Sequence, residues 1–193
     1  MRELFLIAGA NGSGKTTLAK ELLPEFKLEF VNADEIASEI NPQSVEAVKI
    51  TAGKNFFAKV KELVSLGKSI AIETTLSGRY LIRFIEYFKK NGYLITLVFV
   101  FLDNPEIAIA RIEVRVRNGG HHIPNQDVRR RFYRGMKNFW GIYKNLADSW
   151  EIYYNGEHGF IQVATGEMDN YTVIDETLFM LFKGGLTDEI GKL

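Results

Sequence analysis

Short apolar segments alternate along the chain with longer segments in which apolar residues recur every three or four positions. The short segments predict β-strands at residues 4–8, 30–31, 69–72, 93–102 and 150–154, with a further strand at 160–164 after a turn at Asn155 and Gly156. The longer segments predict helices at residues 15–23, 45–66, 80–90, 105–117, 126–146 and 175–182. Asn32 and Glu35 have the spacing of a capping box, which predicts a further helix that begins after Asn32. Strands that alternate with helices indicate a mostly parallel sheet, here of five strands, covered by helices on both faces. We therefore expect one three-layer α/β/α domain over residues 1–193.

The composition is that of an ordinary globular protein, with 46% hydrophobic and 25% charged residues. The chain has no cysteine, which excludes disulfides, a thiolate zinc site and a cysteine nucleophile, and favours a cytoplasmic location. The longest apolar run, residues 94–102, is about half of the roughly 20 residues that a membrane-spanning helix needs. No membrane association is therefore expected.

A glycine-rich loop lies between the first predicted strand and the first predicted helix. Residues 9–16 match the phosphate-binding loop pattern at every fixed position, and the strand and helix around them are the context that the motif requires. Backbone N–H groups of such a loop converge on phosphate oxygens, the lysine contacts the β- and γ-phosphates, and the hydroxyl that follows it binds Mg²⁺. The sequence thus predicts a P-loop NTPase fold of the nucleoside-kinase type that binds ATP and Mg²⁺. The predicted nucleotide-binding residues of this loop are Gly9, Ala10, Asn11, Gly12, Ser13, Gly14, Lys15, Thr16 and Thr17.

Two other segments resemble motifs of a different class of P-loop protein, the ABC ATPases. Residues 76–78, Leu-Ser-Gly, resemble the signature of ABC ATPases, and residues 98–103 resemble a Walker B strand that ends in Asp103. However, Asn104 follows Asp103, where an ABC ATPase has the glutamate that activates water. Only about sixty residues separate Lys15 from Leu76, too few for an ABC helical subdomain. These two facts favour a kinase.

Two carboxylates lie where kinase chemistry needs them. Glu73 ends a predicted strand beside the loop strand, so we expect its carboxylate to reach the Mg²⁺ together with Thr16. Asp34 follows the second strand and is placed to accept the proton of the substrate hydroxyl as a general base. The alternative for Glu73 is a residue at the strand end that faces solvent. The alternative for Asp34 is an acid in the first turn of a helix, where its charge interacts favourably with the helix dipole.

A strongly basic segment is the candidate lid, at about residues 111–134. Arg111 and Arg115 are four residues apart on one helical face, and Arg130 and Arg131 follow a flexible Gly-Gly loop. A closing lid would bring guanidinium groups to the phosphates and exclude water. A solvated basic face and a nucleic-acid phosphate track are the alternatives, but stacking aromatic residues are not interleaved in the segment. His121, next to His122, is expected to contact substrate or to order the lid, not to bind metal.

These motifs together resemble the zeta-toxin-like P-loop kinases, particularly their short stand-alone bacterial members. The matching segments are residues 9–17, 32–37, 73–78, 111–124, 130–132 and 150–155. The Gly-Gly-His-x-Ile-Pro sequence at residues 119–124 is far more specific than the loop alone.

The resemblance implies phosphoryl transfer from ATP to a sugar hydroxyl, which in characterised toxins is the 3′-hydroxyl of UDP-N-acetylglucosamine. Asp34 would be the base, and Glu73 with Thr75 would help to hold metal or substrate. By looser analogy with nucleoside monophosphate kinases, Arg111 would stack on adenine. An antitoxin protein is an implied partner. The groups that would stabilise the transferred phosphoryl are Lys15, Arg115 and one or both of Arg130 and Arg131.

The sequence therefore predicts an ATP-dependent kinase that phosphorylates a hydroxyl of a small metabolite, with a UDP-N-acetyl sugar as one candidate. Two other functions stay open from the residues alone. One is an ATP-binding or ATP-hydrolysing switch, ABC-like or otherwise, without an acceptor substrate. The other is a polynucleotide kinase, which the scarcity of stacking aromatic residues in the basic segment disfavours.

Overall fold

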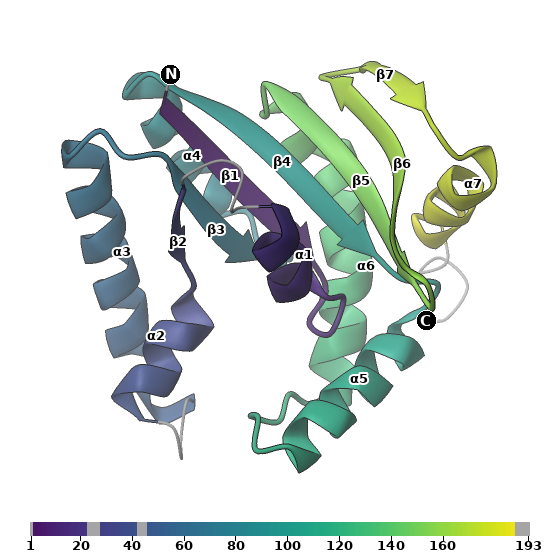
Figure 1. Cartoon of the computed structure of the whole chain (residues 1–193), viewed down its shortest axis with the longest axis horizontal. Helices are drawn as coiled ribbons and strands as arrows, with labels where there is room; N and C mark the ends of the chain where they lie inside the picture. The colour runs from purple at the N-terminus through teal and green to yellow at the C-terminus, as the bar shows by residue number, and fades with distance from the viewer. Residues whose placement is uncertain (1, 23–27, 42–45, 188–193) are drawn as a thin grey trace.

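A seven-stranded β-sheet forms the middle layer of the protein (Figure 1). The computed structural model describes residues 2–22, 28–41 and 46–187. The strands lie in the order β2-β3-β1-β4-β5-β6-β7. The first five are parallel, β6 is antiparallel to β5, and β7 is antiparallel to β6. The mostly parallel sheet confirms the predicted fold class, but the predicted count of five strands is wrong. The strands are β1 (Arg2–Gly9), β2 (Glu29–Val31), β3 (Ile70–Thr74), β4 (Tyr93–Phe101), β5 (Ser149–Gly156), β6 (Gly159–Glu167) and β7 (Asn170–Val173).

The two additional strands extend the parallel sheet at one edge. β6 follows β5 in a hairpin, and its residues 160–164 match the predicted sixth segment that the count of five left out. The turn of that hairpin lies at residues 157–158, since Asn155 and Gly156 still pair with Phe160 and Gly159. β7 has only four residues and is mostly exposed, so it carries no hydrophobic pattern that the sequence could reveal.

Helices precede or follow most strands, near their predicted positions. α2 begins after Asn32, whose side-chain oxygen accepts a hydrogen bond from the Asp34 N–H at 2.9 Å. Of the predicted helix 45–66, residue 45 lies outside the described residues. The helix predicted at 126–146 ends at Gly141, and a short 3₁₀ turn follows. The helices are α1 (Lys15–Leu22), α2 (Ala33–Ile40), η2 (Glu46–Val48), α3 (Lys49–Ser65), α4 (Leu81–Lys90), α5 (Pro105–Arg117), α6 (Asn125–Gly141), η3 (Tyr143–Asn145) and α7 (Glu176–Gly185).

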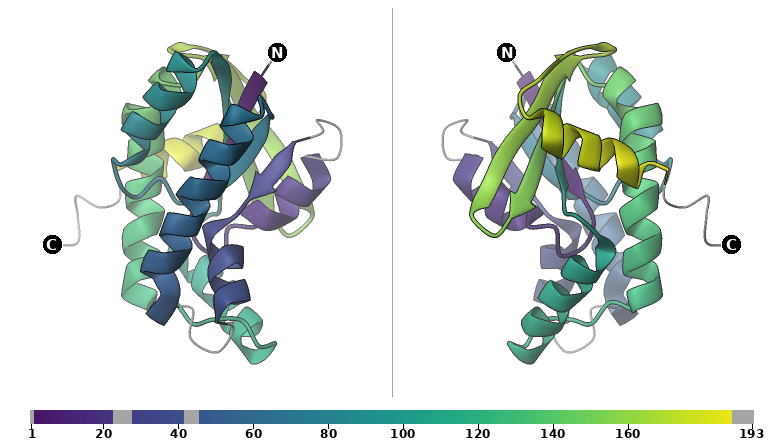
Figure 2. Two further views of the ribbon diagram at one scale, coloured as in Figure 1. Left: turned by 90° about the vertical axis from the view of Figure 1, so that its left-hand side faces the viewer. Right: turned by 90° about the vertical axis from the view of Figure 1, so that its right-hand side faces the viewer.

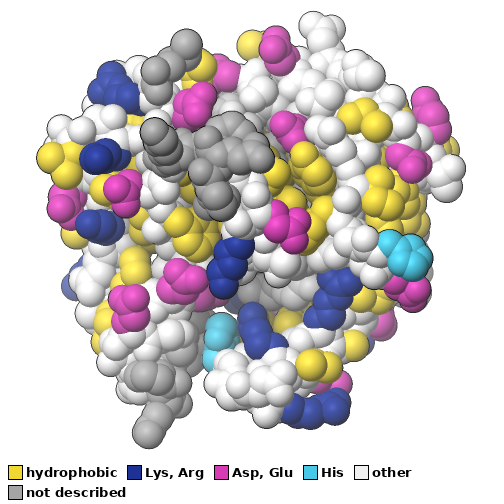
Figure 3. Space-filling model, in the orientation of Figure 1, with side chains coloured by type: hydrophobic (Ala, Val, Ile, Leu, Met, Phe, Trp, Pro, Cys, Tyr) yellow, Lys and Arg dark blue, Asp and Glu magenta, His cyan; other side chains and the backbone are white. Residues whose placement is uncertain are grey.

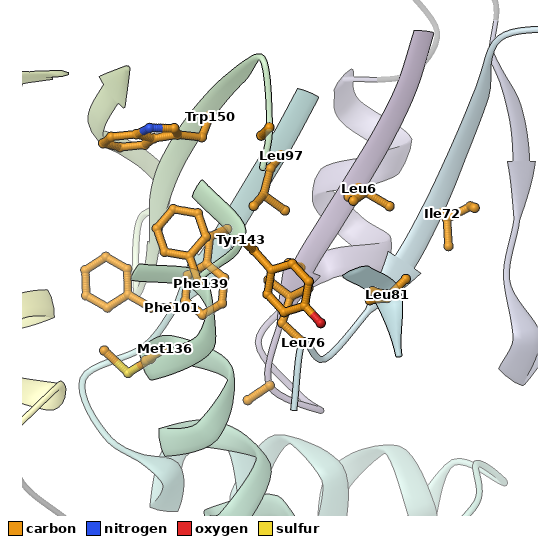
Figure 4. Packing of buried hydrophobic residues seen from close by; sticks show 14 of the residues in the cluster. Leu6, Ile72, Leu76, Leu81, Leu97, Phe101, Met136, Phe139, Tyr143 and Trp150 are labelled. Carbon is orange, nitrogen blue, oxygen red and sulfur yellow. The ribbon is translucent and has the colours of Figure 1, made fainter. Parts of the chain in front are cut away.

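Helices cover both faces of the sheet, and the two side views show α1 and α6 on opposite sides (Figure 2). The central strands β1 and β4 are apolar almost throughout because both of their faces are buried. On one face, Leu18 of α1 packs against Val98 and Val100. On the other face, side chains of α6 and η3 such as Phe139 and Tyr143 pack against β4 (Figure 4). The prediction of three layers is confirmed.

Among the described residues, no helix has both the length and the apolar character that crossing a membrane requires.

Candidate functional site

The parallel strands bring three chain segments together at one edge of the sheet. Ala8, just before the P-loop, pairs with Thr74 at the end of β3, and Val31 at the end of β2 pairs with Ile72. The residues that follow these strands therefore lie side by side at their carboxyl ends. This is the edge at which open α/β sheets bind their ligands.

A cleft of about 1220 Å³ opens at this edge, between the P-loop, α2 and the segment that joins α5 to α6. Figure 3 shows a hollow on this face of the molecule. The structure brings most of the predicted site residues into the cleft. Those that line it are Asn11, Gly12, Gly14, Lys15, Thr16, Thr17, Asp34, Glu73, Thr75, Arg111, Arg115, His121 and Arg131. Predicted residues that do not line it are Gly9, Ala10, Ser13 and Arg130.

Lys15 lies inside the P-loop and not in solvent. Its side chain is buried, and Nζ donates a hydrogen bond to the carbonyl oxygen of Ala10 at 2.8 Å. Burial lowers the pKa of the Lys15 ammonium below its usual value, whereas the carboxylates of Glu73 and Asp34 act in the opposite direction. Lys15 thus lies close enough to Glu73 and Asp34 for their negative charges to raise the pKa of its ammonium.

Glu73 combines a buried carboxylate with an unsatisfied oxygen. Oε1 is inaccessible to solvent and has no hydrogen-bond partner among the described residues. Burial raises the pKa of the Glu73 carboxyl, and the nearby Lys15 ammonium and Thr16 hydroxyl oppose that shift. An orphaned carboxylate oxygen beside a hydroxyl suits Mg²⁺, which binds one or two protein oxygens and takes its other ligands from water and phosphate. No group of three histidine, cysteine or acidic side chains that could hold a metal ion occurs in the described ranges.

The segment from α5 to α6 faces the P-loop across the cleft. Arg131 donates a hydrogen bond from Nη1 to Oδ1 of Asn11 at 3.0 Å. Arg115 donates from Nη2 to the carbonyl oxygen of His121 at 3.3 Å. Arg130 is different, because it does not line the cleft. Its guanidinium pairs with Asp127, 2.9 Å between Nη2 and Oδ1, and Nη2 of Arg131 lies 3.9 Å from Oδ2 of the same carboxylate. Of the two arginines that the sequence left undecided, the structure places only Arg131 in the cleft.

The charges that line the cleft are divided between its two sides. Every charged side chain that α2 and β3 contribute is acidic: Asp34, Glu35, Glu39 and Glu73. The charged side chains from the P-loop, α1, α5 and α6 are basic, apart from Asp127. Figure 3 shows acidic side chains over the α2 side of the hollow, and basic and histidine side chains on the opposite side.

Some lining residues were not predicted. Glu35, Glu39 and Ser38 lie on the exposed face of α2, and spacing on that helix from Asp34 and Glu35 would have revealed them. Asp127 could have been found by its spacing of three and four residues before Arg130 and Arg131. Asn155 does not line the cleft, and no local spacing points to it, because it contacts the P-loop from 142 residues away, through a hydrogen bond from Nδ2 to the Ser13 carbonyl oxygen.

The residues that resembled an ABC ATPase do not lie where that function needs them. Asp103 is exposed and accepts a hydrogen bond from the Tyr154 hydroxyl at 2.8 Å, and it does not line the cleft. Leu76 is buried, and Asn138 of α6 donates a hydrogen bond to its carbonyl oxygen. Both segments are therefore accounted for by structural contacts.

A P-loop between a central strand and a helix, with basic residues of a helical segment across the cleft, is the arrangement found in P-loop kinases. The family model described as "Zeta toxin" matches residues 2–161, which is most of the chain. The protein therefore belongs to the zeta toxin family.

Two related proteins match over most of their own length. An uncharacterized protein of Haemophilus influenzae is 33% identical over 124 residues, which cover 64% of this chain and 88% of that protein. The cytidylate kinase of Archaeoglobus fulgidus is 28% identical over 156 residues, which cover 76% of this chain and 80% of the kinase.

Three solved structures share the fold over the whole chain. The native AvrRxo1-ORF1:-ORF2 complex has a TM-score of 0.77 at 18% identity, and its structure with ATP has a TM-score of 0.76. This chain spans only 66% of the length of the matched AvrRxo1 chain. The PezAT toxin-antitoxin system of Streptococcus pneumoniae has a TM-score of 0.63 at 19% identity, with 88% of its chain covered.

Proposed function

We propose that the protein is an ATP-dependent kinase that transfers the γ-phosphoryl group of ATP to a hydroxyl of a small metabolite. The observation that carries this proposal is the division of charge in the cleft. A triphosphate is favoured on the basic side, beside the P-loop amides and the start of α1. A hydroxylated acceptor is favoured on the α2 side, because carboxylates accept hydrogen bonds from hydroxyl groups.

Thr16 and Glu73 would hold Mg²⁺ in this arrangement. The supporting observation is the unpartnered Oε1 of Glu73, which lies near the Thr16 hydroxyl. When bound, the ion would neutralise charge on the β- and γ-phosphate oxygens.

In the transfer itself, the acceptor hydroxyl oxygen forms a bond to the γ-phosphorus while the bond between that phosphorus and the ADP oxygen breaks. The hydroxyl proton passes to the carboxylate of Asp34, which is exposed at the first turn of α2 and lines the cleft. The guanidinium groups of Arg115 and Arg131 stabilise the charge on the transferred group, together with Lys15. Arg131 is favoured over Arg130 for this role because Arg131 lines the cleft and contacts Asn11, whereas Arg130 does not line it.

The segment at residues 111–134 is the proposed lid. Arg111 lies near the start of this segment and would contact the adenine, while Thr75 and His121 would contact the acceptor. Closure of the segment would bring Arg115 and Arg131 to the phosphates and exclude water from the cleft.

The acidic α2 side bears on the choice of acceptor. A polynucleotide would place several phosphates near Glu35 and Glu39, so the charge division disfavours a polynucleotide kinase. A UDP-N-acetyl sugar stays a candidate if its diphosphate lies toward the arginines. An antitoxin protein is a candidate partner, as the PezAT toxin-antitoxin system shares the fold.

A metabolite screen tests the proposed function. The protein is incubated with labelled ATP, Mg²⁺ and a fractionated metabolite extract, and labelled products are identified by mass. We expect a phosphomonoester that Lys15→Ala does not form. ATP hydrolysis that no fraction accelerates would instead indicate the switch. Binding of oligonucleotides that weakens steeply with salt, followed by their labelling, would indicate a polynucleotide kinase.

A further inference from the structure

The hairpin of β5 and β6 contacts the P-loop at the carboxyl ends of the parallel strands. Near its turn, Asn155 pairs with Phe160 in the antiparallel ladder. The side-chain nitrogen Nδ2 of Asn155 donates a hydrogen bond of 2.8 Å to the carbonyl oxygen of Ser13. This contact joins the P-loop to a part of the chain that carries no phosphate-binding motif.

Gly14 shows how closely the hairpin approaches. Its φ of +93° lies in a region that residues with a side chain rarely adopt. A Cβ atom built on Gly14 would lie 2.2 Å from Nδ2 of Asn155 and 3.3 Å from the Phe160 ring. The hairpin therefore packs directly on the peptide that joins Ser13 to Gly14.

That packing determines the direction of one backbone amide. A peptide unit is planar and trans, so its C=O and N–H groups point in opposite directions. Because the Ser13 carbonyl is directed toward Asn155, the N–H of Gly14 points away from the hairpin. Gly14 itself lines the cleft.

Asn155 is also contacted by Arg111, the first residue of the proposed lid. Arg111 of α5 donates a hydrogen bond from Nη2 to the backbone oxygen of Asn155 at 3.3 Å. Asn155 is thus the link in a chain of contacts from α5 through the hairpin to the P-loop.

We propose that Asn155 is a positioning residue for nucleotide binding: its side-chain amide fixes the Ser13–Gly14 peptide so that the Gly14 N–H is directed at a nucleotide phosphate. This inference rests on the proposed kinase function. It adds a residue of the β5–β6 hairpin to the nucleotide site, one that touches the P-loop and not the substrate.

The decisive variant is Asn155→Asp, which keeps the size of the side chain and removes the amide donor. At neutral pH its carboxylate cannot donate to the Ser13 carbonyl, and we expect the Kd and the KM of ATP to rise about tenfold, with little change in kcat. Near pH 5 a fraction of the aspartic acid is protonated and can donate, so the difference from wild type should shrink. A loss of packing alone would not recover with pH.

The matched control is His158→Ala, which changes an exposed residue in the turn of the same hairpin. It should bind ATP as wild type does. Equal ATP affinity in wild type and Asn155→Asp at neutral pH would overturn the proposal, as would an equal loss in His158→Ala.

A nucleotide-free measurement separates this inference from the proposed function. In NMR spectra of the free protein, Asn155→Asp should shift the Ser13 carbonyl carbon and the Gly14 amide resonances, and His158→Ala should leave them unchanged. If wild type binds no ATP but these shifts occur, the contact orients the peptide and the kinase proposal fails. Unchanged shifts would overturn the positioning role even in an active kinase.

Discussion

The ammonium of Lys15 and the carbonyl oxygen of Ala10, five positions earlier, are joined by a hydrogen bond of 2.8 Å across the P-loop. The bond holds the lysine inside the loop, close to Glu73 and Asp34. Binding of a triphosphate would exchange this bond for contacts to the β- and γ-phosphates, so that the ammonium would keep a partner throughout.

Lys15→Ala should therefore abolish nucleotide binding or turnover. The variant removes the only ammonium that the described part of the cleft lining provides, and we expect kcat/KM to fall by at least about 100-fold. Calorimetry with ATP and a steady-state assay measure the two effects. A variant with wild-type ATP affinity and turnover would contradict the role of the P-loop.

Asp34→Asn tests the general base. The amide cannot accept the hydroxyl proton, so kcat should fall by about 10²- to 10⁴-fold while ATP still binds. Equal turnover in wild type and variant would remove Asp34 from the mechanism. Ser38→Ala is the control for an altered α2 backbone, since the Ser38 hydroxyl lies in the same cleft but donates to the Asp34 backbone oxygen and not to its carboxylate.

Arg131→Ala and Arg130→Ala form a matched pair of neighbouring arginines. Both pair with Asp127, but Arg131 lines the cleft and contacts Asn11, whereas Arg130 does not line the cleft. We expect the first variant to lose about 100-fold or more in kcat and the second to stay within about threefold of wild type. The reverse order of effects would show that α6 presents the other arginine during transfer.

Glu73→Gln should separate stability from function. Burial raises the pKa of Glu73, so the folded state binds this proton more tightly than the unfolded chain does. The carboxyl therefore costs no stability at pH values below its usual pKa, and its cost grows as the pH rises through the raised pKa.

The uncharged glutamine escapes this cost, so Glu73→Gln should unfold at a higher temperature than wild type at pH 7.5 and at a similar temperature at pH 4. For a protein of this size, each kcal/mol gained corresponds to about 2–4 °C. Mg²⁺-dependent ATP turnover should fall in the same variant. Thermal unfolding at the two pH values provides the check, and a lower melting temperature at pH 7.5 would contradict the account.

The parts of the fold and site that were predictable share one property: their signal lies within a short segment. The P-loop at residues 9–16 and the cap at Asn32 depend on neighbours within a few residues. The α/β alternation follows from the burial of both sheet faces, which makes β1 and β4 apolar almost throughout.

The unpredicted parts depend on distant partners. β7 is short and exposed, and it exists because the β6 edge offers it hydrogen bonds. The choice of Arg131 over Arg130 follows from which face of α6 turns toward Asn11, 120 residues away. The contact of Asn155 with the P-loop arises in the same way, from the position of the β5–β6 hairpin.

The acidic α2 side of the cleft also has a consequence after phosphoryl transfer. An acceptor that enters uncharged would leave as a phosphomonoester with about two negative charges near neutral pH. Its new charges would lie near Asp34 and Glu35, and repulsion would expel the product and oppose the return of the phosphoryl group to ADP. The same carboxylates that accept hydrogen bonds from a neutral alcohol would thereby weaken the binding of its phosphorylated form and speed product release.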